Sequence, residues 1–479
     1  MQTIAIVGGG FAGTMTAVNL WRLSDRPVRV HVINASQSFA RGTAYGTPRG
    51  EHLLNVAARN MSALPDFPAH FVDWLRSRSD FAELDDPALR ELFAPRRIYG
   101  DYLSGLFASC LSPIDARGEV QVETVQAEAV DIEIEDDDHA EITFADGGGL
   151  SVDRVVLATG NQAPGSLPGA SLLAHDERYF GNPWAIDRWM EQVLRTPSPP
   201  KRIVLLGTGL TMVDVMLTLQ QLGWEGSVVA LSRNGMLPRS HFRGIAYEDY
   251  LPENAETLGL AELAELVQFH CRRLRDMSQD PAIAIDKLRP HTQRLWTSLS
   301  AEDRKLFLRR YAASWNVMRH RIAPSVHELI TDALDTGRLR VIAGSIKNLR
   351  AGERGIDVQF EDSHGNVAEE TGDLVINCTG PQSCLSQSGV PLFDALLRKG
   401  YARCDALDMG LEVDDQFAAI DRSGEPSNVV HAIGPLLKGS LWETTAVPEL
   451  RVQAMRVAEI LLQREPASLQ EEEILEYYI

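Results

Sequence analysis

The sequence predicts an α/β fold with two Rossmann-like dinucleotide-binding domains and a helical insertion. Two stretches of the form strand, glycine-rich turn and helix support this: IAIVGGGFAGTMTAV at 4–18 and IVLLGTGLTMVDVML at 203–217. A helical apolar period covers most of residues 245–335. Two nucleotide-binding units in one chain of 479 residues, with helices inserted into the second, account for all three observations.

The first unit begins as a β-α-β motif. Apolar runs predict a strand at 3–8, a helix at 12–23 and a strand at 28–33. A long loop, 41–66, follows. The pattern then predicts these further elements: helices at 68–78 and 99–109, and a β-meander over 119–134 and 140–157 that ends in the buried strand 154–160.

The second unit repeats this beginning. A strand is predicted from 202, a helix to about 222 and a strand at 227–232. After the helical stretch, the pattern predicts strands at 338–343, 355–361, 372–380 and 428–434, and a helix at 447–463. Proline and glycine at 163–169 and 196–200 predict a domain boundary near 165–200.

Composition excludes several classes of protein. A formal net charge of −20 disfavours nucleic-acid binding, which needs clustered Lys and Arg. No stretch approaches the ~20 apolar residues of a membrane span, and the strand that begins at Thr3 leaves no room for a signal peptide. The five cysteines include no C-x-x-C pair, which predicts a reducing, cytoplasmic location and excludes a flavin disulfide reductase dithiol. No zinc-spaced Cys/His set and no G-x-S-x-G motif is present.

Gly8, Gly10 and Gly13 fit the dinucleotide motif G-x-G-x-x-G between a strand and a helix. The first glycine permits the tight turn, the second lets a pyrophosphate approach the backbone, and the third allows close helix–strand packing. An acid commonly follows about 20 residues later to bind the ribose. Asn34 ends the second strand here, and we expect it to take that contact through its amide.

In the second turn Gly207 and Gly209 are present, but Met212 occupies the third position and requires looser helix packing. Ser232, Arg233 and Arg239 follow the next strand. Serine and arginine in place of an acid suit a 2′-phosphate, so we expect NADPH, with NADH possible. The alternative is a solvated basic loop.

Two such units predict two dinucleotides, a resident flavin and a nicotinamide that reduces it. The chain then divides into a discontinuous FAD-binding domain, an NAD(P)H-binding domain and a helical insertion. Their expected bounds are 1–165 plus 372–479, 200–242 plus 336–371, and 243–335.

Several motifs together resemble the FAD/NAD(P)-binding family of two-dinucleotide flavoproteins, which is similar to class B flavin monooxygenases of the N-hydroxylating type. They are the paired turns, RGTAYGTPRGEHLLNV at 41–56, GPLLKGSLWETTAVPELRVQA at 434–454, and the strand ends Ala158-Thr159-Gly160 and Cys378-Thr379-Gly380. The resemblance covers nearly the whole chain. It implies FAD in the first domain and NAD(P)H in the second, and it implies no particular substrate.

The resemblance also implies further cofactor contacts. In such flavoproteins a helix like the one with Pro448 in its first turn points its positive end at the flavin, whereas the alternative is an ordinary capped helix. The 41–66 loop is expected to approach the FAD, with His52 as a weaker candidate for a general base. The expected contacts are Arg41, Gly42, Asn55, Met61, Thr159, Gly160, Gly380, Gly434, Thr444, Thr445 and Ala446.

The stretch SWNVMRHRIAP at 314–324 places Trp315, Arg319 and His320 within helical reach of one another. Arg309, Arg310 and Arg321 are near in sequence. In so acidic a chain, this cluster is a candidate for the nicotinamide phosphates or a substrate carboxylate. The alternative is a helix face paired with surface acids. The weak catalytic candidates are therefore His52, Asn55, Arg319 and His320.

These observations favour a flavin-dependent monooxygenase that uses NAD(P)H and O₂ to oxygenate a small, amino-bearing substrate. The main alternative is an NAD(P)H-dependent FAD oxidoreductase or amine-type oxidase without oxygen insertion. A nucleotide-binding redox sensor is a third hypothesis. The sequence leaves the substrate, the atom oxidised and the oligomeric state open.

Overall fold

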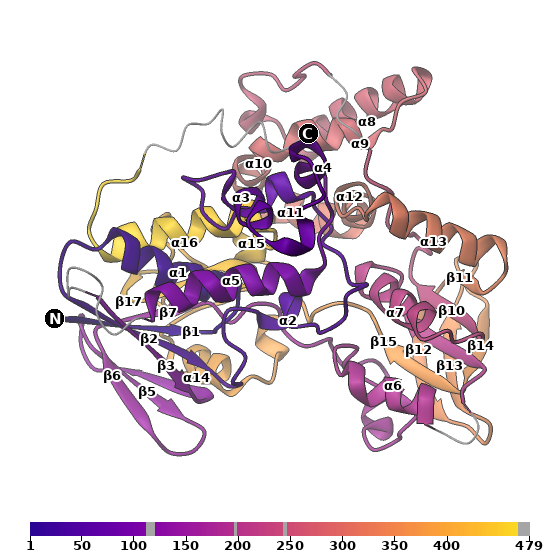
Figure 1. Cartoon of the computed structure of the whole chain (residues 1–479), viewed down its shortest axis with the longest axis horizontal. Coiled ribbons are helices and arrows are strands. Elements are labelled where there is room, and N and C mark those ends of the chain that lie inside the picture. Colours follow the sequence, from indigo (N-terminus) through magenta and orange to yellow (C-terminus); the bar gives the residue numbers. More distant parts are fainter. Residues whose placement is uncertain (112–119, 196–198, 243–246, 468–479) are drawn as a thin grey trace.

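The computed structural model describes residues 1–111, 120–195, 199–242 and 247–467. Two mostly parallel sheets form the centres of two α/β bodies, which lie side by side in Figure 1. Helices inserted between strands of the second body lie above both. The predicted α/β fold with two Rossmann-like units is therefore confirmed.

The first body is built on a six-stranded sheet in which only the edge strand β16 is antiparallel. Along its central strand, Ile4 and Ile6 face one layer while Ala5 and Val7 face the other, as the two-residue period of a strand requires. Helices α1, α5 and α16 form the first layer, and the small sheet β4–β6 with α14 forms the second.

The elements of the first body, with the sheet strands in spatial order, are β16 (Ala418–Ile420), β17 (Pro426–Ala432), β7 (Arg154–Leu157), β1 (Gln2–Val7), β2 (Val28–Asn34), β3 (Val120–Gln126), β4 (Ala129–Ile134), β5 (Ala140–Phe144), β6 (Gly149–Val152), α1 (Phe11–Leu23), α2 (Gly42–Tyr45), α3 (His70–Arg76), α4 (Asp86–Arg90), α5 (Arg96–Cys110), α14 (Pro391–Lys399), α15 (Lys438–Leu441) and α16 (Val447–Leu461).

The second body repeats this plan around a five-stranded parallel sheet. Ile203 and Leu205 of its central strand face helices α6, α7 and α13, whereas Val204 and Leu206 face the small sheet β12–β14. Its elements are β11 (Leu339–Ala343), β10 (Ser227–Ser232), β9 (Arg202–Leu206), β15 (Leu374–Asn377), β8 (Tyr179–Phe180), β12 (Ser345–Ala351), β13 (Ile356–Glu361), β14 (Val367–Gly372), α6 (Ile186–Arg195), α7 (Leu210–Gln221) and α13 (Pro324–Asp335).

Three expectations about where elements belong were wrong. Strand β15 pairs with β9 in the second sheet, so residues 374–377 do not belong to the first domain. Helix α13 packs its apolar face into the core of the second body and is not part of the insertion. The run 119–134 is not one piece of a meander, because β3 pairs with β2 in the main sheet and only β4 continues to β5.

The inserted helices have a core of their own. They are α8 (Leu260–Asp276), α9 (Ala282–Leu288), α10 (Thr292–Ser298), α11 (Ala301–Arg310) and α12 (Ala312–Arg319). Trp296 and Trp315 lie in this core together with Trp442 of the first body. The insertion is thus packed directly onto the segment that precedes α16.

Two linkers connect the bodies, and they lie against each other. Pro164 and Pro381 form an antiparallel bridge, and the Gln382 amide donates to the Ala163 carbonyl at 2.9 Å. The chain therefore enters and leaves the second body at one place. Within the described part of the chain, no helix combines the length and apolarity needed to cross a membrane.

Candidate functional site

The two glycine turns have nearly the same backbone geometry. Gly8 has a φ of +120° and Gly207 a φ of +118°. A Cβ added to Gly8 would lie 2.2 Å from the Ala158 carbonyl oxygen, and one added to Gly207 would lie 2.3 Å from that of Cys378. Both turns thus fit only glycine, and each lies against the end of the neighbouring strand.

The helices that follow these turns begin without a cap. Gly10 and Gly209 are the N-caps of α1 and α7, neither helix receives a side-chain cap, and neither has an acid in its first turn. Their first amide groups are left for an anion, which the positive end of a helix attracts. A Cβ on Gly10 would meet only the Gly42 Cα, at 3.7 Å, and one on Gly209 nothing within 4 Å. The Thr159 hydroxyl beside the first turn is buried and has no hydrogen-bond partner among the residues that the structure describes.

The third motif position distinguishes the turns. A Cβ at Gly13 would lie 1.9 Å from the Gly8 carbonyl oxygen, so α1 can pack closely only with glycine there. Met212 at the matching position is fully buried in the core of the second body. Helix α7 is thus held against its sheet by the packing of the Met212 side chain, whereas α1 lies against its sheet through close backbone contact at Gly13.

Asn34 lies at the end of β2, as expected for a ribose contact, but its amide has partners within the protein. Its Oδ1 accepts from the Gly9 amide at 3.2 Å, and its Nδ2 donates to the Ser36 and Ser38 carbonyls at 2.9 and 3.2 Å. Asn34 therefore orders the turn and the following loop. Its ribose contact stays a prediction.

The three residues expected near a 2′-phosphate differ in their surroundings. The Ser232 hydroxyl lies 2.8 Å from that of Thr208 and accepts from the Gly235 amide. Arg239 is paired with Asp280 of the insertion at 2.8 Å. Arg233 is exposed and has no ion pair or hydrogen bond among the described residues. Arg233 is thus the available cation at this strand end.

The 41–66 loop contains residues of several kinds. Gly42, at a φ of +53°, lies over Gly10, where an added Cβ would meet the Gly10 Cα at 3.1 Å. Arg41 is paired with Asp101 at 2.6 Å. Met61 is buried in the core of the first body. Gly42, which the sequence assigned to the flavin, thus lies directly against the first turn.

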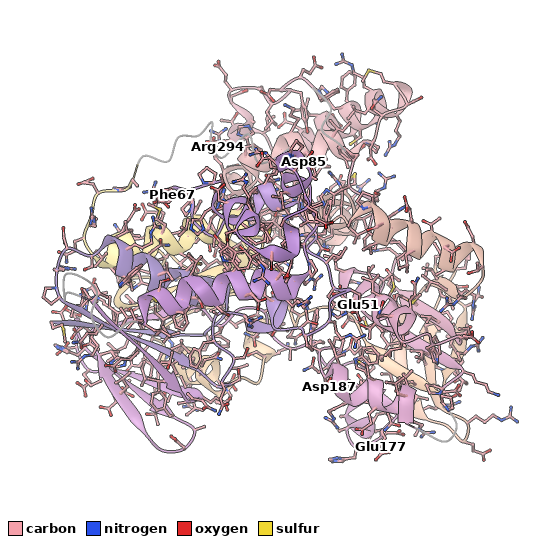
Figure 2. The ribbon with its side chains drawn as sticks, in the orientation of Figure 1. Glu51, Phe67, Asp85, Glu177, Asp187 and Arg294 are labelled. Atoms are coloured by element: carbon pink, nitrogen blue, oxygen red, sulfur yellow. The ribbon has the colours of Figure 1, made fainter. Side chains whose placement is uncertain are left out.

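His52 lies between the two bodies; the preceding residue, Glu51, is seen beside α7 in Figure 2. Its Nε2 lies 3.2 Å from the Asp214 carbonyl and 2.9 Å from the Thr218 hydroxyl, both on α7. Its Nδ1 lies 2.9 Å from the Thr47 hydroxyl. A carbonyl only accepts, so the proton is on Nε2, and burial lowers the pKa of His52 and keeps the ring neutral. The ring thus joins the bodies, with no nitrogen left for a general base.

The start of α16 combines open backbone with a buried hydrogen-bond network. Ala446 is its N-cap without a side-chain cap, and Thr445 before it is exposed. The Thr444 hydroxyl donates to the Gly434 carbonyl at 2.9 Å, and the Gly434 amide donates to Gln453 Oε1 at 3.0 Å. Gly434 and Thr444 therefore support this helix start, while Thr445 and Ala446 are open to a ligand.

A buried set of charged side chains lies beside this helix start, and we refer to it as the α16 charge cluster. Arg289 is paired with Glu449 at 3.0 Å, and Arg319 with Glu443 at 3.5 Å. Trp315 Nε1 donates to Glu443 Oε1 at 3.1 Å. The members of the cluster are Arg289, Arg319, His320, Lys438, Glu443 and Glu449.

Two members of this cluster have neither a hydrogen bond nor an ion pair in the part of the chain that the structure describes. The Lys438 ammonium lies 5.5 Å from the Trp442 ring centroid, and burial lowers the pKa of Lys438. Burial, followed by the Arg319 charge, lowers the pKa of His320 to about 4, so its ring is neutral. Among the members of the cluster, three basic side chains face two carboxylates.

Only part of the predicted arginine cluster reaches this place. Arg319 and His320 do, whereas Arg309 and Arg310 are exposed on α11 and Arg321 is paired with Asp286 at 2.7 Å. The carboxylates of the cluster were missed, since they lie more than 100 residues away along the chain. Nothing in their local sequence indicates an arginine partner.

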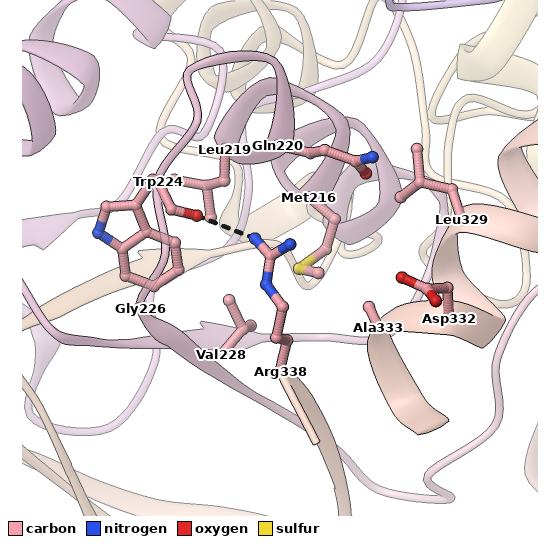
Figure 3. Close-up of a pocket in the computed structure, with 10 residues that line it drawn as sticks. All are labelled: Met216, Leu219, Gln220, Trp224, Gly226, Val228, Leu329, Asp332, Ala333 and Arg338. Carbon is pink, nitrogen blue, oxygen red and sulfur yellow. Dashed lines mark hydrogen bonds between the residues drawn. The ribbon is translucent and has the colours of Figure 1, made fainter. Parts of the chain in front are cut away.

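A separate small pocket lies at the other end of α7 from Gly209 (Figure 3). It is lined by Met216, Leu219 and Gln220 of α7 and by Leu329 and Asp332 of α13. None of its lining residues belongs to either glycine turn.

Two uncapped glycine turns on two Rossmann-like bodies are the backbone arrangement typical of proteins with two dinucleotide-binding domains. Residues 5–162 match the family described as FAD-NAD(P)-binding, which confirms the resemblance for the first body. A Mycobacterium tuberculosis protein described as uncharacterized is 22% identical over 528 residues, with 98% of this chain and 96% of that protein covered.

Solved structures share the fold over nearly the whole chain. L-lysine 6-monooxygenase from Pseudomonas syringae has a TM-score of 0.66 at 16% identity, covering 97% of this chain and 99% of that one. Ornithine N-hydroxylase from Kutzneria sp. 744, solved with reduced FAD, NADP⁺ and L-ornithine, has a TM-score of 0.63 at 14% identity, covering 96% and 98%. At these identities the likeness establishes the two-body fold.

Proposed function

We propose that this protein is a cytoplasmic FAD- and NADPH-dependent monooxygenase that oxygenates a small, amino-bearing molecule. The observation that carries this proposal is the pair of uncapped, ligand-open glycine turns in a chain whose whole length follows the fold of amine-oxygenating flavoproteins. The amino group of the substrate is inferred from the lysine and ornithine named for those neighbours.

In this proposal FAD belongs to the first body and NADPH to the second. Gly10 with Gly42 and the Thr159 hydroxyl would receive the FAD pyrophosphate, and Gly209 with Arg233 would receive NADPH. When bound, FAD accepts a hydride and activates O₂, chemistry that no protein side chain supplies. Thr445 and Ala446 would place the positive end of α16 at the flavin edge, where reduction gathers negative charge.

The α16 charge cluster supports an acidic group on the substrate. Its surplus of one positive charge, with Lys438 unbonded, matches a single carboxylate. A half-buried cation with no ion pair among the described residues favours a ligand that brings a counter-charge. The rings of Trp442 and Trp296 are stacked with their centroids 4.9 Å apart, and they would exclude water beside the bound carboxylate.

The cysteines favour this proposal over thiol redox chemistry. Cys378 lies at the second glycine turn, and burial raises the pKa of its thiol so that it stays protonated. A bound flavin would then deliver its electrons to O₂ or to a substrate. The two-body division also stays a proposal: a discontinuous FAD-binding domain enclosing an NADPH-binding domain, which in turn contains the helical insertion.

The deciding experiment combines cofactor analysis with isotope transfer. The purified protein should contain FAD, oxidise NADPH faster when a substrate from a panel of amino acids and amines is added, and incorporate ¹⁸O from ¹⁸O₂ into the product. Product without label, together with stoichiometric peroxide, would establish an oxidase instead. A colourless protein that does not bind added FAD would refute both the monooxygenase and the oxidase hypothesis.

A further inference from the structure

The contact between the two bodies contains a buried ion pair. Arg96, the first residue of α5, donates through Nη1 to Asp214 Oδ2 of α7 at 2.9 Å. The two side chains are 10% and 7% exposed. With His52 these residues form what we refer to as the inter-body joint.

The first-body side of the joint is rigidly built. Segments 52–54 and 94–96 pair with each other, through Arg96 N to His52 O at 2.8 Å and Leu54 N to Ala94 O at 2.8 Å. Arg96 Nε also donates to the Leu53 carbonyl at 2.9 Å. The Arg96 guanidinium is therefore fixed by its own body before it meets Asp214.

The joint links α7, which follows the second glycine turn, to α5, which packs against the helix that follows the first. On one side α5 packs against α1, the helix that begins at Gly10. On the other side Asp214 and Thr218 lie on α7, the helix that begins after Gly209. A second contact reinforces this side, because His241 Nε2 donates to the Asn55 carbonyl at 2.6 Å. If one glycine turn moves relative to the other, the hydrogen bonds of the joint and the His241–Asn55 bond must break.

The chemistry of the joint indicates a role in orientation. An apolar interface of equal size would hold the bodies as firmly, because desolvation offsets most of the attraction in a buried ion pair. An apolar interface can slide, however, whereas a charged hydrogen bond fixes direction and distance. The paired linkers at Pro164 and Pro381 hold the bodies elsewhere, so rotation about the linkers is opposed by the joint.

We propose that Arg96, Asp214 and His52 are positioning residues that hold the second body, and the nicotinamide bound to it, in register with the flavin of the first. The inference rests on the proposed function. In the step that they serve, a hydride with its two electrons leaves NADPH, which becomes NADP⁺, and enters FAD, which takes up one further proton. The two bodies then work as one rigid unit during this transfer.

The test compares two hydride donors in the full-length, FAD-loaded protein. NADPH depends on the second body, whereas N-benzyl-1,4-dihydronicotinamide has no phosphate and reaches the flavin without it. In Asp214→Asn, flavin reduction at saturating NADPH should slow at least about tenfold, and reduction by the benzyl compound should stay within about twofold of wild type. Asp214→Glu, which retains the charge, should recover part of the NADPH rate. Asp335→Asn, an exposed acid at the end of α13, is the matched control.

Three results would overturn the proposal: an unchanged NADPH rate in Asp214→Asn, an equal slowing with both donors, or an NADPH rate as low in Asp214→Glu as in Asp214→Asn. A second measurement is independent of the cofactors. Amide hydrogen exchange over 52–55 and α7 should be slow in the wild type and at least about tenfold faster in Asp214→Asn. Rapid exchange in the wild type would refute the joint itself. A wild type with a protected joint but no FAD would instead count against the proposed function.

Discussion

Alanine at Gly8 and alanine at Gly10, the first two glycines of the first turn, should impair the protein in different ways. At Gly8 the backbone has a φ of +120°, and a Cβ would lie 2.2 Å from the Ala158 carbonyl oxygen. At Gly10 the φ is −84° and the ψ −164°, an extended conformation open to any residue, and the nearest atom is 3.7 Å away. The structure thus requires Gly8 for the fold, whereas Gly10 leaves space for a ligand.

The expected magnitudes follow from these contacts. In Gly8→Ala, backbone strain of about 1–3 kcal/mol adds to overpacking of about 1–3 kcal/mol, so the free energy of unfolding should fall by about 2–6 kcal/mol. In Gly10→Ala the added methyl meets no protein atom closely, and the stiffer unfolded chain offsets any loss by about 0.4–1 kcal/mol. Its stability should therefore stay within about 1 kcal/mol of wild type.

FAD affinity should change in Gly10→Ala, because the methyl group occupies the approach of the pyrophosphate to the backbone. A lost hydrogen bond to a charged group costs about 1.5–3 kcal/mol, which is roughly a tenfold to hundredfold loss of affinity. Thermal unfolding of the FAD-free proteins and fluorescence titration with FAD measure the two effects separately. Gly209→Ala is the matched control, with FAD binding retained and NADPH binding weakened. Wild-type FAD affinity in Gly10→Ala would refute the assignment of the first turn.

Three further variants test other parts of the protein. Arg233→Ala should weaken the binding of NADPH about tenfold to hundredfold and leave the binding of NADH nearly unchanged, as measured in flavin-reduction assays. Equal losses with both cofactors would show that Arg233 supports the structure and does not bind the 2′-phosphate. Lys438→Met should raise the KM for a carboxylate-bearing substrate at least about tenfold, with exposed Lys305→Met as control, and an unchanged KM would contradict the anion site. Burial lowers the pKa of His431 to about 4, whereas the unfolded residue binds its proton near pH 6.5. The contribution of His431 to the free energy of unfolding should therefore fall by about 1.4 kcal/mol per pH unit as the pH drops from 6.5 to 4. Urea unfolding of His431→Gln should show a shallower loss of stability with falling pH than the wild type. The same loss in both proteins would contradict a buried, neutral His431.

The parts of the fold that local patterns determine were predicted well. Both strand–turn–helix units begin and end within a residue or two of the predicted positions, because glycine turns and apolar periods act over short distances. Sheet membership depends on distant partners. Residues 120–126 and 129–134 alternate in the same way, yet only the first pairs with β2. The helical period likewise could not show that Val326 and Ile330 of α13 face the second sheet.

In the candidate site, too, the features set by local sequence were predicted, and those that depend on distant residues were not. The glycines were found because their conformation is required within a few residues. Arg319 and His320 were found as part of a basic stretch, but Glu443 and Glu449 become their neighbours only when the insertion folds onto α16. His52 was a weak candidate for a base, and the structure makes it a contact with Thr218, 166 residues further along the chain. No local pattern contains that information.

The paired linkers bring the two ends of the second body close together in space. Because Pro164 and Pro381 already lie in bridging contact, the segment between them could be removed and the cut ends rejoined by a short turn without stretching the first body. The same geometry would accept a foreign domain whose termini lie close together. A single proteolytic cut in either linker would leave the two halves associated through the other. In a chain arranged in this way, the second body and its insertion together form one continuous segment between two neighbouring points of the first body.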